Sequence, residues 1–247
     1  MQNKLFFDQL AADYDEMISF GESLERKKKL FANIVTPKMS YAADCGCGTG
    51  VDSIALSQLG LKVTGFDPSD EMIKKAKINA KNYNEKIEFS EATIHGIDDN
   101  FENKFDLIVS LGNTFANIKK SDLKDSVNKC YKLLNKNGTL IIHILNYYKI
   151  LKEYNRIVNI TEGKGKYFVR FYDFKENEID FNLLVFNPAN LSGYNLITTS
   201  VYPHSKDDFN HTLNDTGFKQ VEYFSNLKFD RFSIHSSKDL LIRALKG

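Results

Sequence analysis

The 247-residue sequence contains only three cysteines and almost no excess of charge. Cys45, Cys47 and Cys130 form an odd set without a disulfide framework. One residue separates Cys45 from Cys47, and no nearby histidine or second cysteine pair completes a zinc-ligand set, so we predict no metal site and small buried side chains instead. The formal net charge of +1 gives no electrostatic basis for binding nucleic acid or an anionic membrane.

Long hydrophobic runs are also missing. The longest, such as residues 140–145, are too short to span a bilayer. Asp8 interrupts the apolar start of the chain before a signal-peptide core can form, and we therefore expect a cytoplasmic location. Hydrophobic residues still make up 42% of the chain, which is enough for a core in one domain, 1–247, with an insertion.

Strand and helix patterns alternate along most of the chain. Short apolar runs predict strands at 41–45, 62–66, 87–90, 105–111, 139–145, 219–224 and 240–245. Amphipathic spacing predicts intervening helices at 51–59, 70–82, 123–134 and 207–216. This alternation indicates an α/β fold with a doubly wound, mostly parallel, seven-stranded sheet.

Two segments lie outside this alternation. The amino-terminal segment, 1–40, has the spacing of two helices that break near Gly21, and Pro37 ends the second. Residues 165–202 alternate aromatic and β-branched side chains, which predicts an insertion of three antiparallel strands after the fifth strand. This insertion could cover a pocket as a lid, or its rings could simply form the core of a small sheet; the rings are Tyr167, Phe171, Tyr172 and Phe174.

The most informative motif is Asp-Cys-Gly-Cys-Gly-Thr-Gly at residues 44–50, between the first strand and its helix. Its glycines leave backbone that a ligand can approach closely, at the strand end where nucleotide-like ligands bind in open α/β sheets. A dinucleotide-binding loop places two residues between its second and third glycines, whereas Gly50 comes one residue early and Val51 takes that place. Asp67, at the end of the second strand, can accept both hydroxyl hydrogens of a ribose. This carboxylate fits a dinucleotide and any other adenosine-bearing cofactor, so it does not distinguish between them.

The loop spacing is similar to that of S-adenosylmethionine-dependent methyltransferases. Five blocks in order narrow the resemblance to glycine and sarcosine N-methyltransferases: 44–54, 63–72, 111–117, 146–151 and 202–204. The resemblance implies a Rossmann-like methyltransferase fold and S-adenosylmethionine as cofactor. It also implies transfer of a methyl group to a small-molecule acceptor, at an amine nitrogen.

The resemblance also implies cofactor contacts. Arg26 would bind the methionine carboxylate through its guanidinium, unless it is a solvated member of the basic run 26–29. Asp67 would bind the ribose, Pro68, Thr93 and Ile94 would line the adenine, and main chain near Gly46 and Leu111 would meet the methionine part. The full implied set is Arg26, Asp44, Gly46, Gly48, Asp67, Pro68, Met72, Thr93, Ile94, Leu111 and Asn117, the last in place of a family histidine.

On the acceptor side, the resemblance implies that Asn113 hydrogen-bonds the acceptor and that Tyr202 lines its pocket. The chain departs from the family at Leu145, where glycine N-methyltransferase has an arginine that pairs with the amino acid carboxylate; Arg156 or Arg170 could replace it. No catalytic acid or base is predicted, because transfer from a sulfonium depends mainly on positioning the nucleophile.

A second interpretation keeps the cofactor pocket but assigns no reaction. In it, the chain is a cofactor-binding regulatory or partner subunit without an acceptor site of its own. Asn113 and Tyr202 favour the enzyme. For either interpretation we expect a monomer or small homo-oligomer that binds neither nucleic acid nor membrane.

Overall fold

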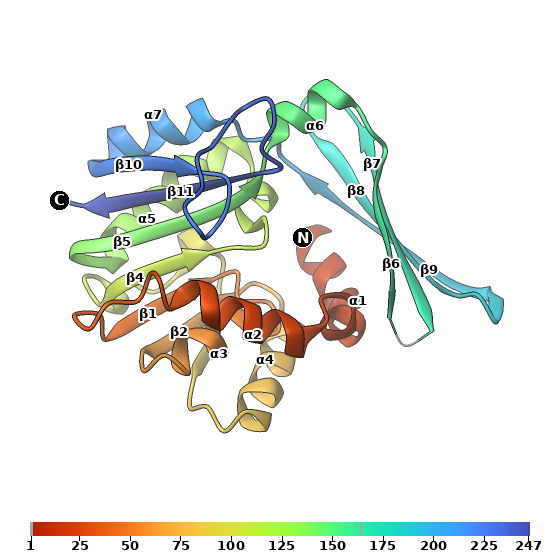
Figure 1. Ribbon diagram of the computed structural model, residues 1–247, viewed down its shortest axis with the longest axis horizontal. Helices are drawn as coiled ribbons and strands as arrows, with labels where there is room; N and C mark the ends of the chain where they lie inside the picture. The colour runs from red at the N-terminus through yellow and green to blue at the C-terminus, as the bar shows by residue number, and fades with distance from the viewer. Residues whose placement is uncertain (1, 164) are drawn as a thin grey trace.

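The computed structural model describes residues 2–163 and 165–247, which form two β-sheets (Figure 1). The larger sheet has seven strands in the order β10-β11-β5-β4-β1-β2-β3. They are β1 (Tyr41–Cys45), β2 (Lys62–Asp67), β3 (Glu88–Glu91), β4 (Phe105–Ser110), β5 (Leu134–Leu145), β10 (Phe218–Phe224) and β11 (Asp239–Lys246). All neighbours are parallel except β11, which is antiparallel to both β5 and β10. The predicted mostly parallel seven-stranded sheet is confirmed.

Helices pack on both faces of this sheet, which makes it doubly wound. One face is covered by α2 (Phe20–Phe31), α3 (Val51–Ser57) and α4 (Asp70–Asn82), and the other by α5 (Leu123–Leu133) and α7 (Lys206–Thr216). Alternate residues of the central strands point into the two cores, so that Leu107 packs on one side and Ile108 on the other. No helix in the described part of the chain is long and apolar enough to cross a membrane.

The two predicted amino-terminal helices are present, but their boundaries differ from the prediction. The break between α1 (Gln2–Met17) and α2 lies at Ser19, which adopts φ 50°, and Gly21 lies inside α2. The helix α2 ends at Phe31, well before Pro37. Helix α1 lies in the angle between the two sheets, away from the large sheet itself (Figure 1).

The smaller sheet corrects the predicted insertion. It has four antiparallel strands in the order β6-β7-β8-β9, and α6 (Tyr147–Glu153) separates it from β5. The strands are β6 (Ile157–Gly163), β7 (Lys166–Phe174), β8 (Ile179–Asn187) and β9 (Asn190–Val201). The prediction of three strands from residue 165 missed β6, whose residues 157–160 are all exposed and therefore lack the alternating burial that marks a strand.

Candidate functional site

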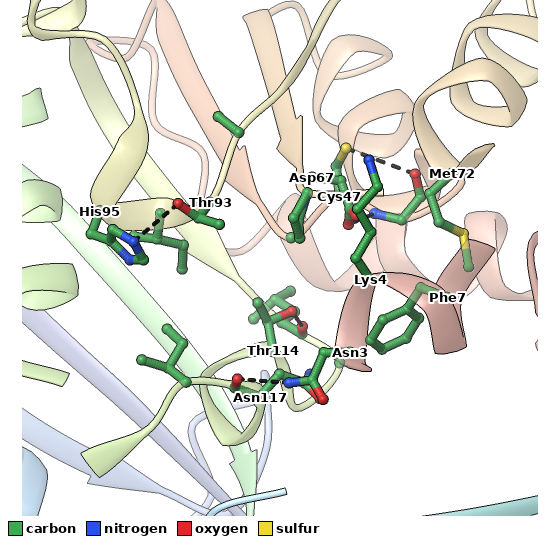
Figure 2. A pocket seen from close by; sticks show the side chains of 18 of the residues that line it. Asn3, Lys4, Phe7, Cys47, Asp67, Met72, Thr93, His95, Thr114 and Asn117 are labelled. Atoms are coloured by element: carbon green, nitrogen blue, oxygen red, sulfur yellow. Dashed lines mark hydrogen bonds between the residues drawn. The ribbon is translucent and has the colours of Figure 1, made fainter. Parts of the chain in front are cut away.

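A cavity of about 800 Å³ lies at the carboxyl ends of β1, β2, β3 and β4, a size typical of small-molecule sites. Its floor comes from the strand ends and loops of the large sheet and the start of α4, and it includes Gly46, Gly48, Asp67, Pro68, Met72, Thr93, Ile94, Leu111 and Asn117. Its cover comes from α1 and the base of the small sheet and includes Asn3, Lys4, Phe7, Tyr14, Glu178, Ser200 and Tyr202. Figure 2 shows the α1 side chains opposite Asp67 and Asn117.

The glycine loop forms the centre of the floor. The amide groups of Gly46 and Cys47 donate to the carbonyl of Phe66 at 2.7 and 3.0 Å, which ties the loop to the end of β2. Gly46, Gly48 and Gly50 adopt φ values of 85°, 51° and 89°, which favour glycine. A side chain at Gly46 would place its Cβ 2.3 Å from Cγ2 of Thr114. Backbone conformation and close packing against Thr114 therefore both require the first glycine.

Asp67 has the geometry of a ribose-binding carboxylate. Its Oδ2 accepts from the Gly48 amide and its Oδ1 from the Ser69 amide, both at 2.9 Å. A carboxylate offers about four acceptor positions, so others remain for ligand hydroxyls. Burial raises the pKa of Asp67 to about 6, although the two amide donors act to lower it. Above about pH 6 the Asp67 carboxyl group is mostly ionised, and it then only accepts hydrogen bonds.

Asp44 lies below the loop and does not line the cavity. Its Oδ2 accepts from the hydroxyl of Ser53 at 2.6 Å, and the side chain is almost fully buried. Burial, followed by the nearby charge of Asp52, raises the pKa of Asp44 to about 7. Asp52 does line the cavity and forms an ion pair with Lys27 at 2.7 Å. Asp44 therefore affects the site only indirectly, through its place below the glycine loop and its interaction with the charge of Asp52.

Pro68 and Met72 follow β2, and the other floor residues follow the carboxyl ends of β3 and β4. Thr93 and buried Ile94 come from the loop after β3, where the hydroxyl of Thr93 lies 3.3 Å from Nε2 of His95. Leu111 and Asn117 come from the segment after β4, with Thr114 between them. These positions bring ten of the thirteen predicted site residues to one cavity: nine on the floor, and Tyr202 on the cover.

Three predicted site residues do not line the cavity: Arg26, Asp44 and Asn113. Arg26 is exposed on α2 and donates to the hydroxyl of Ser23 at 3.1 Å. The amide of Asn113 donates to the hydroxyl of Tyr147 at 2.8 Å and accepts from the Leu145 amide at 3.0 Å. Asn113 thus joins the ends of β4 and β5, and both of its polar atoms have partners within the chain.

The α1 residues of the cover were not anticipated from the sequence. Asn3 donates to the carbonyl of Asn117 at 2.8 Å, and Lys4 forms ion pairs with Glu91 at 2.6 Å and Asp70 at 3.1 Å. Tyr14 lies against Gly48, and burial raises its pKa well above the usual value. Helical spacing had identified the apolar side of this segment, but polar cavity residues on a helix leave no motif in the sequence.

On the acceptor side, the backbone amide of Tyr202 donates to the carbonyl of Ala116 at 2.7 Å and so joins the small sheet to the segment after β4. Neither Arg156 nor Arg170 lines the cavity. Arg156 pairs with Asp173, and Arg170 donates to Asn159 at 2.8 Å. Leu145 and the four rings proposed as a lid (Tyr167, Phe171, Tyr172 and Phe174) also lie outside the lining.

All three cysteines are free and buried, as predicted. Within residues 2–163 and 165–247, no group of three or more histidine, cysteine, aspartate or glutamate side chains is arranged to hold a metal ion.

Known proteins share both the sequence pattern and the fold. A family described as "Methyltransferase domain" matches residues 42–138. The glycine/sarcosine N-methyltransferase of Parasynechococcus marenigrum (strain WH8102) is 24% identical over 230 residues, covering 91% of this chain and 79% of that protein. The carboxy-S-adenosyl-L-methionine synthase of Campylobacter concisus (strain 13826) is 27% identical over 241 residues, covering 92% and 91%.

The fold is shared with a solved structure over almost its whole length. An S-adenosylmethionine-dependent methyltransferase from Clostridium acetobutylicum ATCC 824 has a TM-score of 0.78 at 17% identity, covering 98% of this chain and 99% of that one. The matched domain contains the glycine loop and Asp67, the same residues that form the cavity floor. Together these similarities show that the chain belongs to the class I S-adenosylmethionine-dependent methyltransferases and uses S-adenosylmethionine as its cofactor.

Proposed function

We propose that the chain transfers the methyl group of S-adenosylmethionine to an amine nitrogen of a small molecule. One observation carries this proposal: the cavity continues beyond the predicted cofactor residues to Glu178, Ser200 and Tyr202. That extension provides space for a second molecule beside the cofactor. The names of relatives, among them the glycine/sarcosine N-methyltransferase of Parasynechococcus marenigrum, support nitrogen as the methyl acceptor.

The residues on the floor fit the cofactor. Asp67 retains acceptor positions for ribose hydroxyls, Pro68 and Ile94 offer apolar surface to the adenine, and Gly46 and Leu111 present main chain to the methionine part. The bound cofactor supplies a methyl group on a positively charged sulfur. The chain orients the two reactants and excludes water with α1 and the small sheet, and such positioning can lower a barrier by roughly 7–11 kcal/mol. We assign no general base.

The charges that line the cavity favour a cationic amine as acceptor over a free amino acid. Five carboxylates line it: Asp52, Asp67, Glu91, Asp122 and Glu178. Three of these already have a lysine partner: Glu91 pairs with Lys4, Asp52 with Lys27 and Glu178 with Lys175. In the described chain the other lining lysine or arginine is Lys119, so Asp67 and Asp122 leave a small excess of negative charge. An acceptor carboxylate would therefore meet net negative charge, whereas an ammonium would be attracted. The bound ammonium must then lose a proton to water, because only the neutral amine has the lone pair that attacks the methyl group.

The test is release of S-adenosylhomocysteine by the purified chain with a panel of small amines, amino acids, carboxylates and phenols. We expect product with an amine that lacks a carboxylate and little with glycine. Tight binding of cofactor with no product from any acceptor would instead support a cofactor-binding regulatory or partner subunit. In a second assay, Leu145→Arg should create glycine methylation if the acceptor sits as in glycine N-methyltransferase.

The Campylobacter concisus relative leads to a second candidate, in which the cofactor itself is modified. That protein covers nearly the whole chain and is named for carboxy-S-adenosyl-L-methionine. Mass spectrometry of the nucleoside product separates the candidates when a carboxyl donor is supplied beside the amine. Methyl transfer to the amine leaves S-adenosylhomocysteine, whereas transfer of a carboxyl group from the donor to the cofactor leaves a heavier cofactor. We further propose a cytoplasmic enzyme that acts on small molecules, as a monomer or small homo-oligomer, without nucleic acid or membrane.

A further inference from the structure

The small sheet presents two different faces. Its inner face packs against α1 through Phe168, Leu183, Val185 and Ile197, which share a buried cluster with Phe6. Successive side chains of a strand point to opposite faces, so the neighbours of these residues point away from α1. We call these side chains the outer face: Ile160, Tyr167, Val169, Leu184, Phe186, Tyr194 and Leu196.

The outer face is ordered in two rows across the sheet. Ile160, Val169, Leu184 and Leu196 are direct partners across all four strands. Tyr167, Phe186 and Tyr194 form the second row, in which the rings of Tyr167 and Phe186 stack at 5.5 Å. None of these seven side chains is charged. In Figure 1 the strands extend away from the body of the molecule, with α1 on one side.

These side chains expose an unusual amount of apolar surface. Ile160 is 60% exposed, Tyr194 68% and Leu196 51%, and the other four are half-buried. With roughly 150–200 Å² for a full side chain, the face presents roughly 400 Å², in the range of patches that mark interaction sites. A standard interface buries about 800 Å² per partner, of which a little over half is apolar. The outer face is therefore large enough for the apolar centre of a dimer.

We propose that the outer face is a dimer interface with a second copy of this chain, packed sheet against sheet about a two-fold axis. A two-fold contact brings the same patch of both copies together, so it requires a surface that carries no repelling charge. The seven side chains of the outer face meet that requirement. Glu162 is the partner of Tyr167 on the outer strand β6, so the two-fold axis must pass nearer β8 and β9 to keep the two Glu162 carboxylates apart. Sheets packed in this way lie about 10 Å apart.

The test is sedimentation equilibrium of the full chain between about 1 and 100 µM, a range that spans ordinary homodimer affinities. We expect the wild type to show twice the chain mass, and Leu196→Lys to weaken the dimer at least about 10-fold by placing like charges across the axis. Ile78→Lys is the matched control, because Ile78 is similarly exposed at 54% but lies on α4. This control should leave the dimer unchanged.

Two outcomes would overturn the proposal: a wild type that stays monomeric at the highest concentration, or a Leu196→Lys variant that dimerises like the wild type. Tyr194→Lys, near the turn between β8 and β9, is a second variant in case Leu196→Lys does not fold. Thermal midpoints and cofactor binding of each variant report folding separately. Amide exchange in β6 and β9 should also rise on dilution of the wild type, and an unchanged exchange would again contradict the interface.

Discussion

The floor of the cavity is held by backbone hydrogen bonds to neighbouring strands, whereas the cover is held by side chains that are distant in sequence. On the floor, the glycine loop donates to Phe66 and Asp67 of the adjacent β2. In the cover, Lys166 of the small sheet pairs with Asp13 of α1 at 2.5 Å, and Asp8 of α1 accepts from the Ser69 hydroxyl at 2.6 Å.

This difference predicts separate stabilities for the two parts. The floor belongs to the large sheet and should unfold only with it. The cover depends on one apolar cluster and several half-exposed polar contacts, and regions of this kind open at lower free energy. The floor should therefore tolerate damage to the cover.

The largest effect is expected from Phe6→Ala. Phe6 of α1 is buried against the small sheet, next to Phe7 and Phe181. Its truncation should lower the stability of the cover by about 3–5 kcal/mol. Hydrogen exchange should rise in α1 and β7–β9 and stay slow in the glycine loop. Leu5→Ala is the control, because Leu5 is exposed. Equal loss of protection in the glycine loop would show that floor and cover form one unit.

Gly46→Ala should destabilise the floor instead of the cover. The positive φ and the overlap with Thr114 should together cost about 2–4 kcal/mol in the free energy of unfolding. Gly60→Ala separates the two causes, since Gly60 also has a positive φ but no atom within 4 Å of an added Cβ, and about 1–2 kcal/mol is expected there. Denaturant unfolding measures both. Equal losses would mean that packing against Thr114 contributes nothing.

Asp67→Ala should weaken binding of S-adenosylmethionine by roughly 30–100-fold, or about 2–3 kcal/mol, through the loss of charge-assisted hydrogen bonds to the ribose. Calorimetry measures this, with Asp125→Ala as the control, because Asp125 is exposed on α5 and lies outside the cavity lining. Because the pKa of Asp67 is about 6, wild-type affinity should also fall as the pH drops through 6 and the carboxylate becomes protonated. Affinity that is the same at pH 5 and pH 8 would remove Asp67 from that role.

Asp44→Asn should stabilise the protein above pH 7. The pKa of Asp44 is raised from 3.8 to about 7, so the folded state binds its proton more tightly than the unfolded state. The wild type therefore loses stability from this group as the pH rises from about 4 to 7. The variant should avoid that loss and gain about 1–2 kcal/mol at pH 8, with no gain near pH 4. Thermal unfolding across this pH range provides the check, and a uniform gain would point to another cause.

The smallest effect is expected from Arg26→Ala. Arg26 is exposed and outside the cavity, so cofactor affinity should change by less than about 2-fold, within the range of surface substitutions. Lys27→Ala should be measured beside it, because Lys27 forms an ion pair with Asp52, which lines the cavity. A 10-fold loss of cofactor affinity in Arg26→Ala would support the binding of the methionine carboxylate by Arg26 that the resemblance implies. It would also require α2 to move when the cofactor binds.

Much of the fold and most of the floor could be predicted because they depend on local patterns. Buried strands such as 105–110 are mostly apolar, Asp67 is the last residue of its strand, and the glycine loop follows the end of another. The strand β6 was missed because its first four residues, 157–160, are exposed whichever face they point to. Residues such as Lys4 and Glu178 were missed because their place in the cavity depends on how α1 and the small sheet pack.

The sequence by itself determined the doubly wound sheet, the cofactor loop and the family, since hydrophobic period and glycine spacing act over a few residues. Tertiary structure alone decided that α1 covers the cavity, that Arg26 and Asn113 lie outside its lining, and that one face of the small sheet is left exposed. These features depend on contacts between segments more than a hundred residues apart, such as Asn3 with Asn117 and Asp13 with Lys166. No local pattern encodes such contacts, because they form only when the two sheets meet.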